Sequence, residues 1–175
     1  MGLTDMYRLW YFFILFACVI LQQLLFVPLS GYLFAEPLLP LIVLVILASA
    51  TGSVLAEGLG FFTGFVWGFT QIDTGLPQGV FPLLLTIVAF VPGRLLFDRF
   101  KAPGTLLLAV AIAVAGLFWG LGIIALKLVF VNAYLPSVME FVEILLGTLY
   151  SVLFCLGLSP LLCKFLSRWE WDGSV

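Results

Sequence analysis

Long apolar runs, broken by short polar segments, dominate the chain. Because a helix of about 20 apolar residues crosses the roughly 30 Å hydrocarbon core of a bilayer, this pattern predicts six transmembrane helices. The predicted spans are residues 9–29, 37–50, 54–71, 80–97, 105–130 and 144–165. Almost no chain remains for a soluble module. We therefore expect an all-α membrane protein with a single integral membrane domain over residues 1–175.

The stretch from Pro37 to Gln71 is apolar but too long for one crossing. A single helix of this length would extend for about 50 Å, well beyond the hydrocarbon core. Small and polar residues interrupt the stretch at Ala50–Ser53. We therefore predict two shorter helices joined by a tight turn at this point.

Composition supports a lipid environment and excludes several kinds of chemistry. Hydrophobic residues make up 64% of the chain and charged residues 9%, whereas a soluble domain has roughly 25% charged residues. The chain has no histidine, and its cysteines (Cys18, Cys155 and Cys163) lie in apolar runs without CxxC spacing. We expect neither a metal nor a cofactor. A net charge of −2 gives no reason to expect nucleic acid as a partner.

The cations predict the orientation of the helices. Six of them lie next to spans one, four and six: Arg8, Arg94, Arg99, Lys101, Lys164 and Arg168. Lysine and arginine concentrate on the cytoplasmic side of membrane proteins. With six spans, all three clusters fall on one side, which predicts that both termini are cytoplasmic. The first apolar run is longer than a signal peptide requires, so we expect it to be retained.

Three glycines in the third predicted span share one helical face, because Gly60, Gly64 and Gly68 are spaced four residues apart. Small residues at this spacing let two helix backbones approach closely. Packing within the bundle is one interpretation of this face. Docking of a partner helix or a ligand is the other.

Three charged residues near span ends have both ordinary and functional interpretations. Lys127 either extends its ammonium group to the outer interface or pairs with Glu140, Glu143 or a partner protein. Glu57 suits the first turn of a helix, where the macrodipole favours an acid, and Asp73 suits an exposed turn. No Ser-His, Cys-His or metalloprotease constellation is possible without histidine, so we expect no enzyme.

The chain resembles the rod shape-determining protein family MreD in its size, six-span layout and cytoplasmic termini. The resemblance is sharpest at Glu57–Phe100, EGLGFFTGFVWGFTQIDTGLPQGVFPLLLTIVAFVPGRLLFDRF. This segment has the glycine-rich third helix, short outer loop, apolar helix and basic cytoplasmic loop typical of that family. It departs from the family at Gly68, where many members carry an acid.

The resemblance implies a non-enzymatic scaffold of the bacterial cell-elongation machinery in the inner membrane. Such proteins bind MreC and, in a larger complex, RodA and a class B penicillin-binding protein, with MreB filaments engaged indirectly. Their fold is similar to that of the substrate-binding S components of energy-coupling-factor vitamin importers. Besides membrane lipid, we expect partners to contact Gly60, Gly64, Gly68, Arg94, Arg99 and Lys101.

Two other functions stay open from the sequence. An S component of a vitamin importer is the alternative, although its docking helix would carry small residues where span one has bulky residues such as Phe12, Phe13 and Phe16. A membrane enzyme that depends on Glu57 or Asp73 is the third hypothesis.

Overall fold

A computed structural model describes residues 3–28, 35–70, 75–97, 104–132 and 134–170, with side chains for 9–28, 35–70, 75–97, 104–132 and 134–158. The described residues form α1 (Leu3–Leu21), the π-helical turn η1 (Gln22–Phe26), α3 (Leu39–Thr51), α4 (Ser53–Thr70), α5 (Val80–Leu95), α6 (Thr105–Phe130) and α7 (Val138–Glu170). These ranges contain no β-strand. The prediction of an all-α protein is confirmed.

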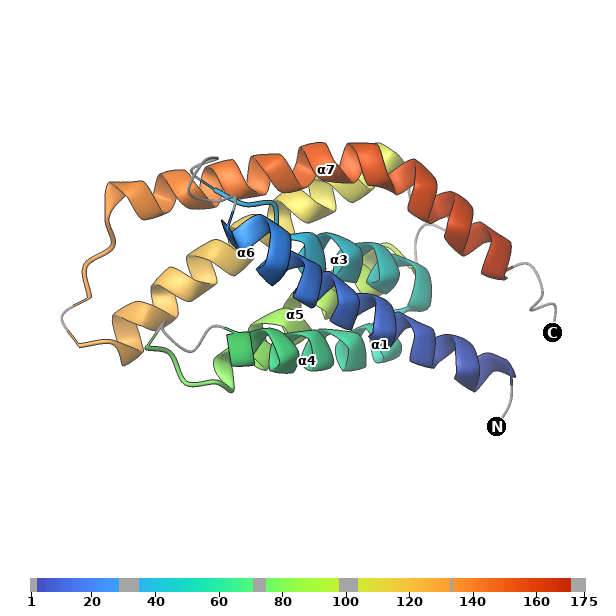
Figure 1. Ribbon diagram of the computed structural model, residues 1–175, viewed down its shortest axis with the longest axis horizontal. Helices are drawn as coiled ribbons and strands as arrows, with labels where there is room; N and C mark the ends of the chain where they lie inside the picture. The colour runs from blue at the N-terminus through green and yellow to red at the C-terminus, as the bar shows by residue number, and fades with distance from the viewer. Residues whose placement is uncertain (1–2, 29–34, 71–74, 98–103, 133, 171–175) are drawn as a thin grey trace.

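The helices form a bundle in which α1 begins and α7 ends at the same end (Figure 1). We call this the proximal end and the opposite one the distal end. The turn between α3 and α4 lies at the proximal end, and the connection from α6 to α7 lies at the distal end (Figure 1). The described chain therefore crosses the bundle an even number of times between the start of α1 and the end of α7.

The predicted break between the second and third helices is confirmed at Gly52. This residue separates α3 from α4 and has a φ of +81°, a region that side-chain-bearing residues rarely adopt. Its N–H donates to Ala48 O at 3.3 Å, and its carbonyl oxygen accepts from Ala56 N–H at 3.0 Å. A glycine at this point lets the chain reverse direction while both helix ends keep backbone hydrogen bonds.

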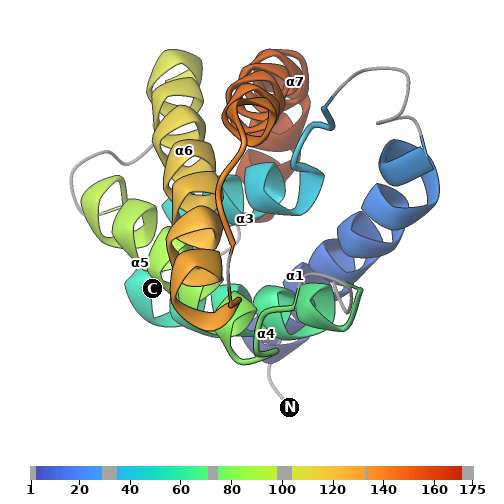
Figure 2. The same ribbon diagram turned by 90° about the vertical axis from the view of Figure 1, so that its left-hand side faces the viewer.

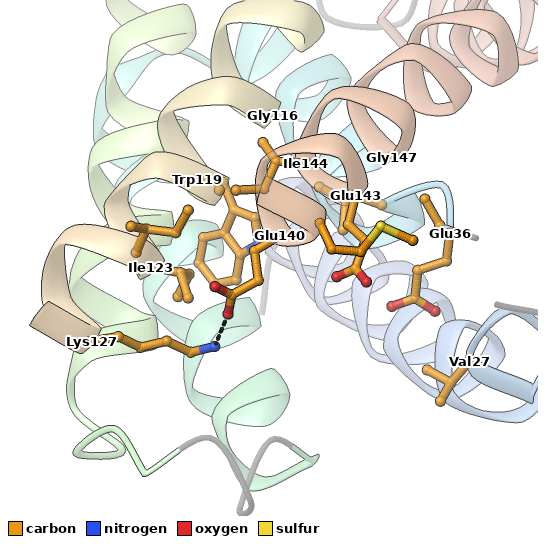
Figure 3. A pocket seen from close by; sticks show the side chains of 15 residues that line it. Val27, Glu36, Gly116, Trp119, Ile123, Lys127, Glu140, Glu143, Ile144 and Gly147 are labelled. Atoms are coloured by element: carbon orange, nitrogen blue, oxygen red, sulfur yellow. Dashed lines mark hydrogen bonds and ion pairs between the residues drawn. The ribbon is translucent and has the colours of Figure 1, made fainter. Parts of the chain in front are cut away.

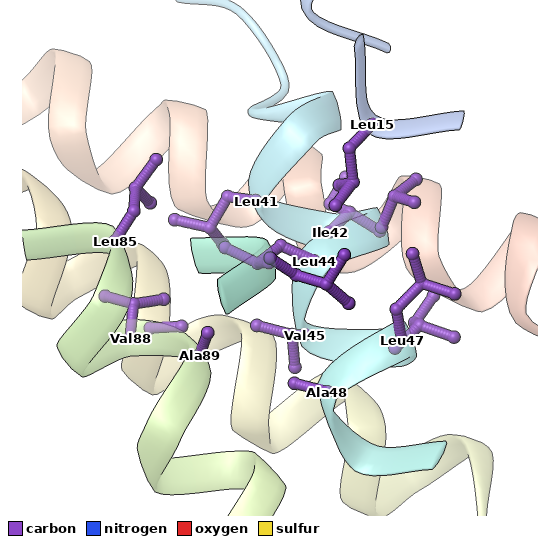
Figure 4. Packing of buried hydrophobic residues seen from close by; sticks show 14 of the residues in the cluster. Leu15, Leu41, Ile42, Leu44, Val45, Leu47, Ala48, Leu85, Val88 and Ala89 are labelled. Carbon is purple, nitrogen blue, oxygen red and sulfur yellow. The ribbon is translucent and has the colours of Figure 1, made fainter. Parts of the chain in front are cut away.

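The central helix is α3, in which every residue from Leu39 to Ser49 is buried. It contacts α1, α4, α5, α6 and α7, and Figure 2 shows it enclosed by the other helices. Its apolar side chains meet Leu15 of α1 and Leu85 and Val88 of α5 (Figure 4). A helix that is apolar all round is typically a buried one. With 13 residues it is about 20 Å long, so it is shorter than the hydrocarbon core that surrounds the bundle.

The outside of the bundle is apolar, as expected for a protein in lipid. Large hydrophobic side chains are widely exposed on the outer helices, among them Val54 (84%), Leu106 (77%) and Val129 (75%). In the described ranges, three stretches are long and apolar enough to cross a membrane: Leu9–Phe26, Thr105–Phe130 and Val138–Leu158. The protein is therefore an all-α membrane protein.

The last helix begins earlier than the predicted start at residue 144. Ser137 Oγ accepts a hydrogen bond from Glu140 N–H at 3.2 Å, and Glu140 Oε2 accepts one from Ser137 N–H at 3.0 Å. This reciprocal pair is a capping box, which satisfies two N–H groups at a helix N-terminus. The helix therefore already includes Val138–Glu143, ahead of the predicted span 144–165.

Candidate functional site

The glycine face of α4 packs against α5. A Cβ atom on Gly60 would lie 2.5 Å from Leu85 O, and one on Gly64 would lie 2.5 Å from Phe81 O. Gly68 is less crowded, since its Cβ would lie 3.3 Å from Gln78 O. Glycine is required at the first two positions because the neighbouring atoms belong to backbone.

This packing corrects the prediction that Gly60, Gly64 and Gly68 dock a partner helix. All three are buried, and α5 occupies the surface that a partner would need. The structure instead shows the other interpretation of the motif, which is close approach of two helices of the same bundle.

The predicted basic patch is described at one of its three positions. Arg94 is exposed in the last turn of α5, with its guanidinium carbon 5.8 Å from the centre of the Phe90 ring. Arg99 and Lys101 lie outside the described residues, as does Asp73. Glu57 is exposed on α4.

A cavity of about 560 Å³ opens at the distal half of the bundle. Its walls come from the distal halves of α6 and α7, from the segment 35–38 that precedes α3, and from Val27 just after η1. Trp119 and Ile123 of α6 contribute apolar surface (Figure 3). Gly116 and Gly120 in α6 and Gly147 in α7 also line it, and a Cβ atom on Gly120 would lie 2.5 Å from Ile144 Cγ2, so these glycines allow close packing beside the cavity.

Four charged residues reach this cavity: Glu36, Lys127, Glu140 and Glu143 (Figure 3). Lys127 Nζ lies 3.4 Å from Glu140 Oε1. Of the two interpretations of Lys127, the structure therefore shows pairing with an acid. Glu140 is the partner, not Glu143.

Tyr134 completes the network around Glu140. Its hydroxyl donates to Glu140 Oε2 at 2.6 Å, and Lys127 Nζ lies 5.3 Å from the centre of its ring. Burial, together with the neighbouring carboxylate, raises the pKa of Tyr134 to about 12. The carboxylate of Glu140 thus accepts bonds from a side chain, a backbone N–H and an ammonium group, which fixes its position at the mouth of the cavity.

Side chains from two other helices hold the start of α3. Leu39 N–H donates to Gln22 Oε1 at 3.0 Å, and Leu38 N–H donates to Ser151 Oγ at 2.8 Å. The first N–H groups of a helix lack partners within it, so these contacts act as caps supplied by η1 and α7. They fix the segment that carries Glu36, and π-helical turns such as η1 are frequent at functional sites.

Three buried polar atoms near this region have no hydrogen-bond partner among the described residues: Gln22 Nε2, Glu36 Oε2 and Thr148 Oγ1. Burial raises the pKa of the Glu36 carboxyl, and the neighbouring Gln22 side chain lowers it by a smaller amount. Buried polar groups are normally hydrogen-bonded, so each of these atoms has unused bonding capacity.

The sequence interpretation did not single out Glu36, Trp119, Tyr134 or Ser151. A signal existed for the Tyr134 network, because Ser137 and Glu140 have the S-x-x-E spacing of a capping box. No comparable signal marks the cavity. Its residues come from four separate parts of the chain, and only the fold brings them together.

No protein-family model, curated protein or solved structure matches this chain.

Proposed function

We propose that the chain is a non-enzymatic membrane scaffold of the bacterial cell-elongation machinery, similar to MreD, which binds MreC and helps to organise peptidoglycan synthesis. The observation that carries the proposal is the resemblance of Glu57–Phe100 to that family. Within the described ranges, this segment contains α5 and most of α4, and these two helices make the most extensive contact of any helix pair. The resembling segment therefore corresponds to one structural unit.

The proposal places the chain in the bacterial inner membrane with six crossings and both termini in the cytoplasm. It is supported by the shared proximal position of the start of α1 and the end of α7, and by the cations beside these ends. The distal cavity would then face the periplasm. RodA and the class B penicillin-binding protein would join in a larger complex, and MreB filaments indirectly.

Purification of the tagged chain in mild detergent, followed by identification of co-purifying proteins, tests this proposal. We expect MreC to be recovered. The combined variant Arg94→Gln, Arg99→Gln and Lys101→Gln should lower the recovery of partners, whereas Glu57→Gln should not. Cysteine labelling next to Arg8 and Arg168 checks that both variants keep their orientation. A stable, monodisperse chain that recovers no MreC would contradict the proposal.

An S component of a vitamin importer is the second candidate, and the distal cavity is the observation that favours it. Mass spectrometry of the purified chain distinguishes the two functions. A vitamin retained at one molecule per chain, without MreC, would favour the importer.

A further inference from the structure

The distal cavity has the size of a small-molecule site. Its volume of about 560 Å³ falls within the roughly 300–1,000 Å³ typical of ligand pockets. Trp119, Ile123 and Met139 provide apolar surface for the body of a ligand. A cavity of this size beside an otherwise closely packed core is well suited to a ligand.

The charges of the cavity do not balance. Lys127 and Glu140 neutralise each other, and Glu140 is also bonded to Tyr134 and Ser137. The carboxylates that line the rest of the cavity belong to Glu36 and Glu143. Within the part of the chain that the structure describes, neither forms an ion pair.

One polar atom of the cavity wall points to a missing hydrogen-bond partner. Glu36 lines the cavity, and its Oε2 is buried and has no partner in the described ranges. Unbonded buried polar groups cost free energy, which a ligand with hydrogen-bond donors would recover.

We infer that the distal cavity binds an organic ammonium group, with Glu36 and Glu143 as its counter-charges and with Trp119, Ile123 and Met139 against the apolar part of the ligand. An ammonium group donates hydrogen bonds and carries the charge that the cavity lacks. An aromatic ring nearby adds a further attraction for cations. The inference holds independently of whether the chain binds MreC.

Other ligand chemistries fit less well. An anion would meet two uncompensated carboxylates, with Lys127 already committed to Glu140. No group of three or more acidic, cysteine or histidine side chains suited to a metal ion occurs among the described residues. The ammonium group can come from a free amine or from the headgroup of phosphatidylethanolamine, since the chain lies in lipid.

Calorimetry on the full chain in maltoside micelles, which carry no ammonium group, tests the inference with three matched probes. These are 2-phenylethylamine, 2-phenylethanol and phenylacetate. We expect the amine to bind at least about tenfold more tightly than the alcohol, and the acid not to bind. Native mass spectrometry of the chain extracted from membranes shows whether phosphatidylethanolamine is retained, which would identify a headgroup as the source.

Matched variants separate a specific site from general adsorption. Glu36→Gln and Glu143→Gln should each weaken binding of the amine, or release the retained lipid, by about tenfold. Glu57→Gln on α4, which is exposed outside the cavity, should leave both unchanged. Equal affinity for amine and alcohol would overturn the inference. If the chain neither binds the amine nor retains the lipid, the inference is also wrong. The same holds if neither Glu36→Gln nor Glu143→Gln changes the binding.

Discussion

Two helix pairs of this bundle place glycines at their contact, but the glycines meet different kinds of atoms. A Cβ on Gly64 of α4 would lie 2.5 Å from Phe81 O, a backbone atom of α5. A Cβ on Gly120 of α6 would also lie 2.5 Å from its nearest neighbour, but this atom is Ile144 Cγ2, in a side chain of α7. The same short distance therefore has different consequences. A side chain can change rotamer, whereas a helix backbone can yield only by moving the whole helix.

The comparison separates a rigid part of the molecule from an adjustable one. The α4–α5 pair is closed by backbone contact and leaves no surface between the two helices for a partner. The α6–α7 pair is joined partly through side chains and borders the distal cavity. We expect ligands and variants to change the spacing of α6 and α7 before that of α4 and α5.

The largest expected effect is that of Gly64→Ala. The added methyl group would overlap the backbone of α5, so we expect a loss of about 3 kcal/mol in the free energy of unfolding. Gly58→Ala is the matched control, because a Cβ there meets nothing within 4 Å. Reversible unfolding in mixed micelles measures both. Equal stability of the two variants would show that the α4–α5 contact is looser than described.

Removal of a cap on α3 should have the next largest effect. Gln22→Leu leaves Leu39 N–H buried without its acceptor, and we expect a loss of about 2 kcal/mol in unfolding free energy. Gln23→Leu breaks only an exposed bond to Thr70 and should cost about 0.5 kcal/mol. The same unfolding assay compares them. A larger loss for Gln23→Leu would contradict the capping role.

The adjustable contact is tested by Gly120→Ala. We expect a loss of about 1 kcal/mol, because the Ile144 side chain can move aside. In a double-mutant cycle, Ile144→Ala should largely cancel this loss. If instead the two losses simply add, the methyl group of the alanine meets something other than Ile144.

The smallest expected effect concerns the ion pair at the mouth of the cavity. Lys127 and Glu140 have side-chain exposures of 24% and 27%, so Lys127→Gln should lower the unfolding free energy by only about 0.5 kcal/mol. The difference from wild type should shrink at high salt, because salt screens partly exposed pairs. A salt-independent loss would assign Lys127 a packing role. Arg94→Gln, at the proximal end, is the control.

Helix positions could be predicted where the length of an apolar run, or an interruption in it, determines where a helix begins and ends. The boundaries of α6 match the predicted span 105–130, because an uninterrupted apolar run has one natural extent. The turn at Gly52 followed from the excessive length of the stretch Pro37–Gln71. The helix α7 begins before the predicted span at residue 144, because hydropathy marks only the apolar part of a helix, whereas Ser137 and Glu140 cap a polar first turn.

The candidate site was predictable only in part. Periodicity placed Gly60, Gly64 and Gly68 on one face, but periodicity does not say whether that face meets the same chain or another one. Pairing of Lys127 with an acid was one of the open alternatives, and geometry selected Glu140. The cavity itself had no sequence signal, because empty space depends on how α6, α7 and the segment before α3 are placed.

The capping of α3 has a consequence for the order of assembly. Leu38 N–H is bonded to Ser151, which lies 113 positions later in the chain. Until the ribosome has delivered that residue, this amide must find water or a temporary acceptor. With 13 residues, α3 is also too short to insert into the membrane efficiently by itself. We therefore expect α3 to reach its final packing only after α7 has been synthesised. Truncated chains that lack Ser151 should then be degraded early by membrane proteases.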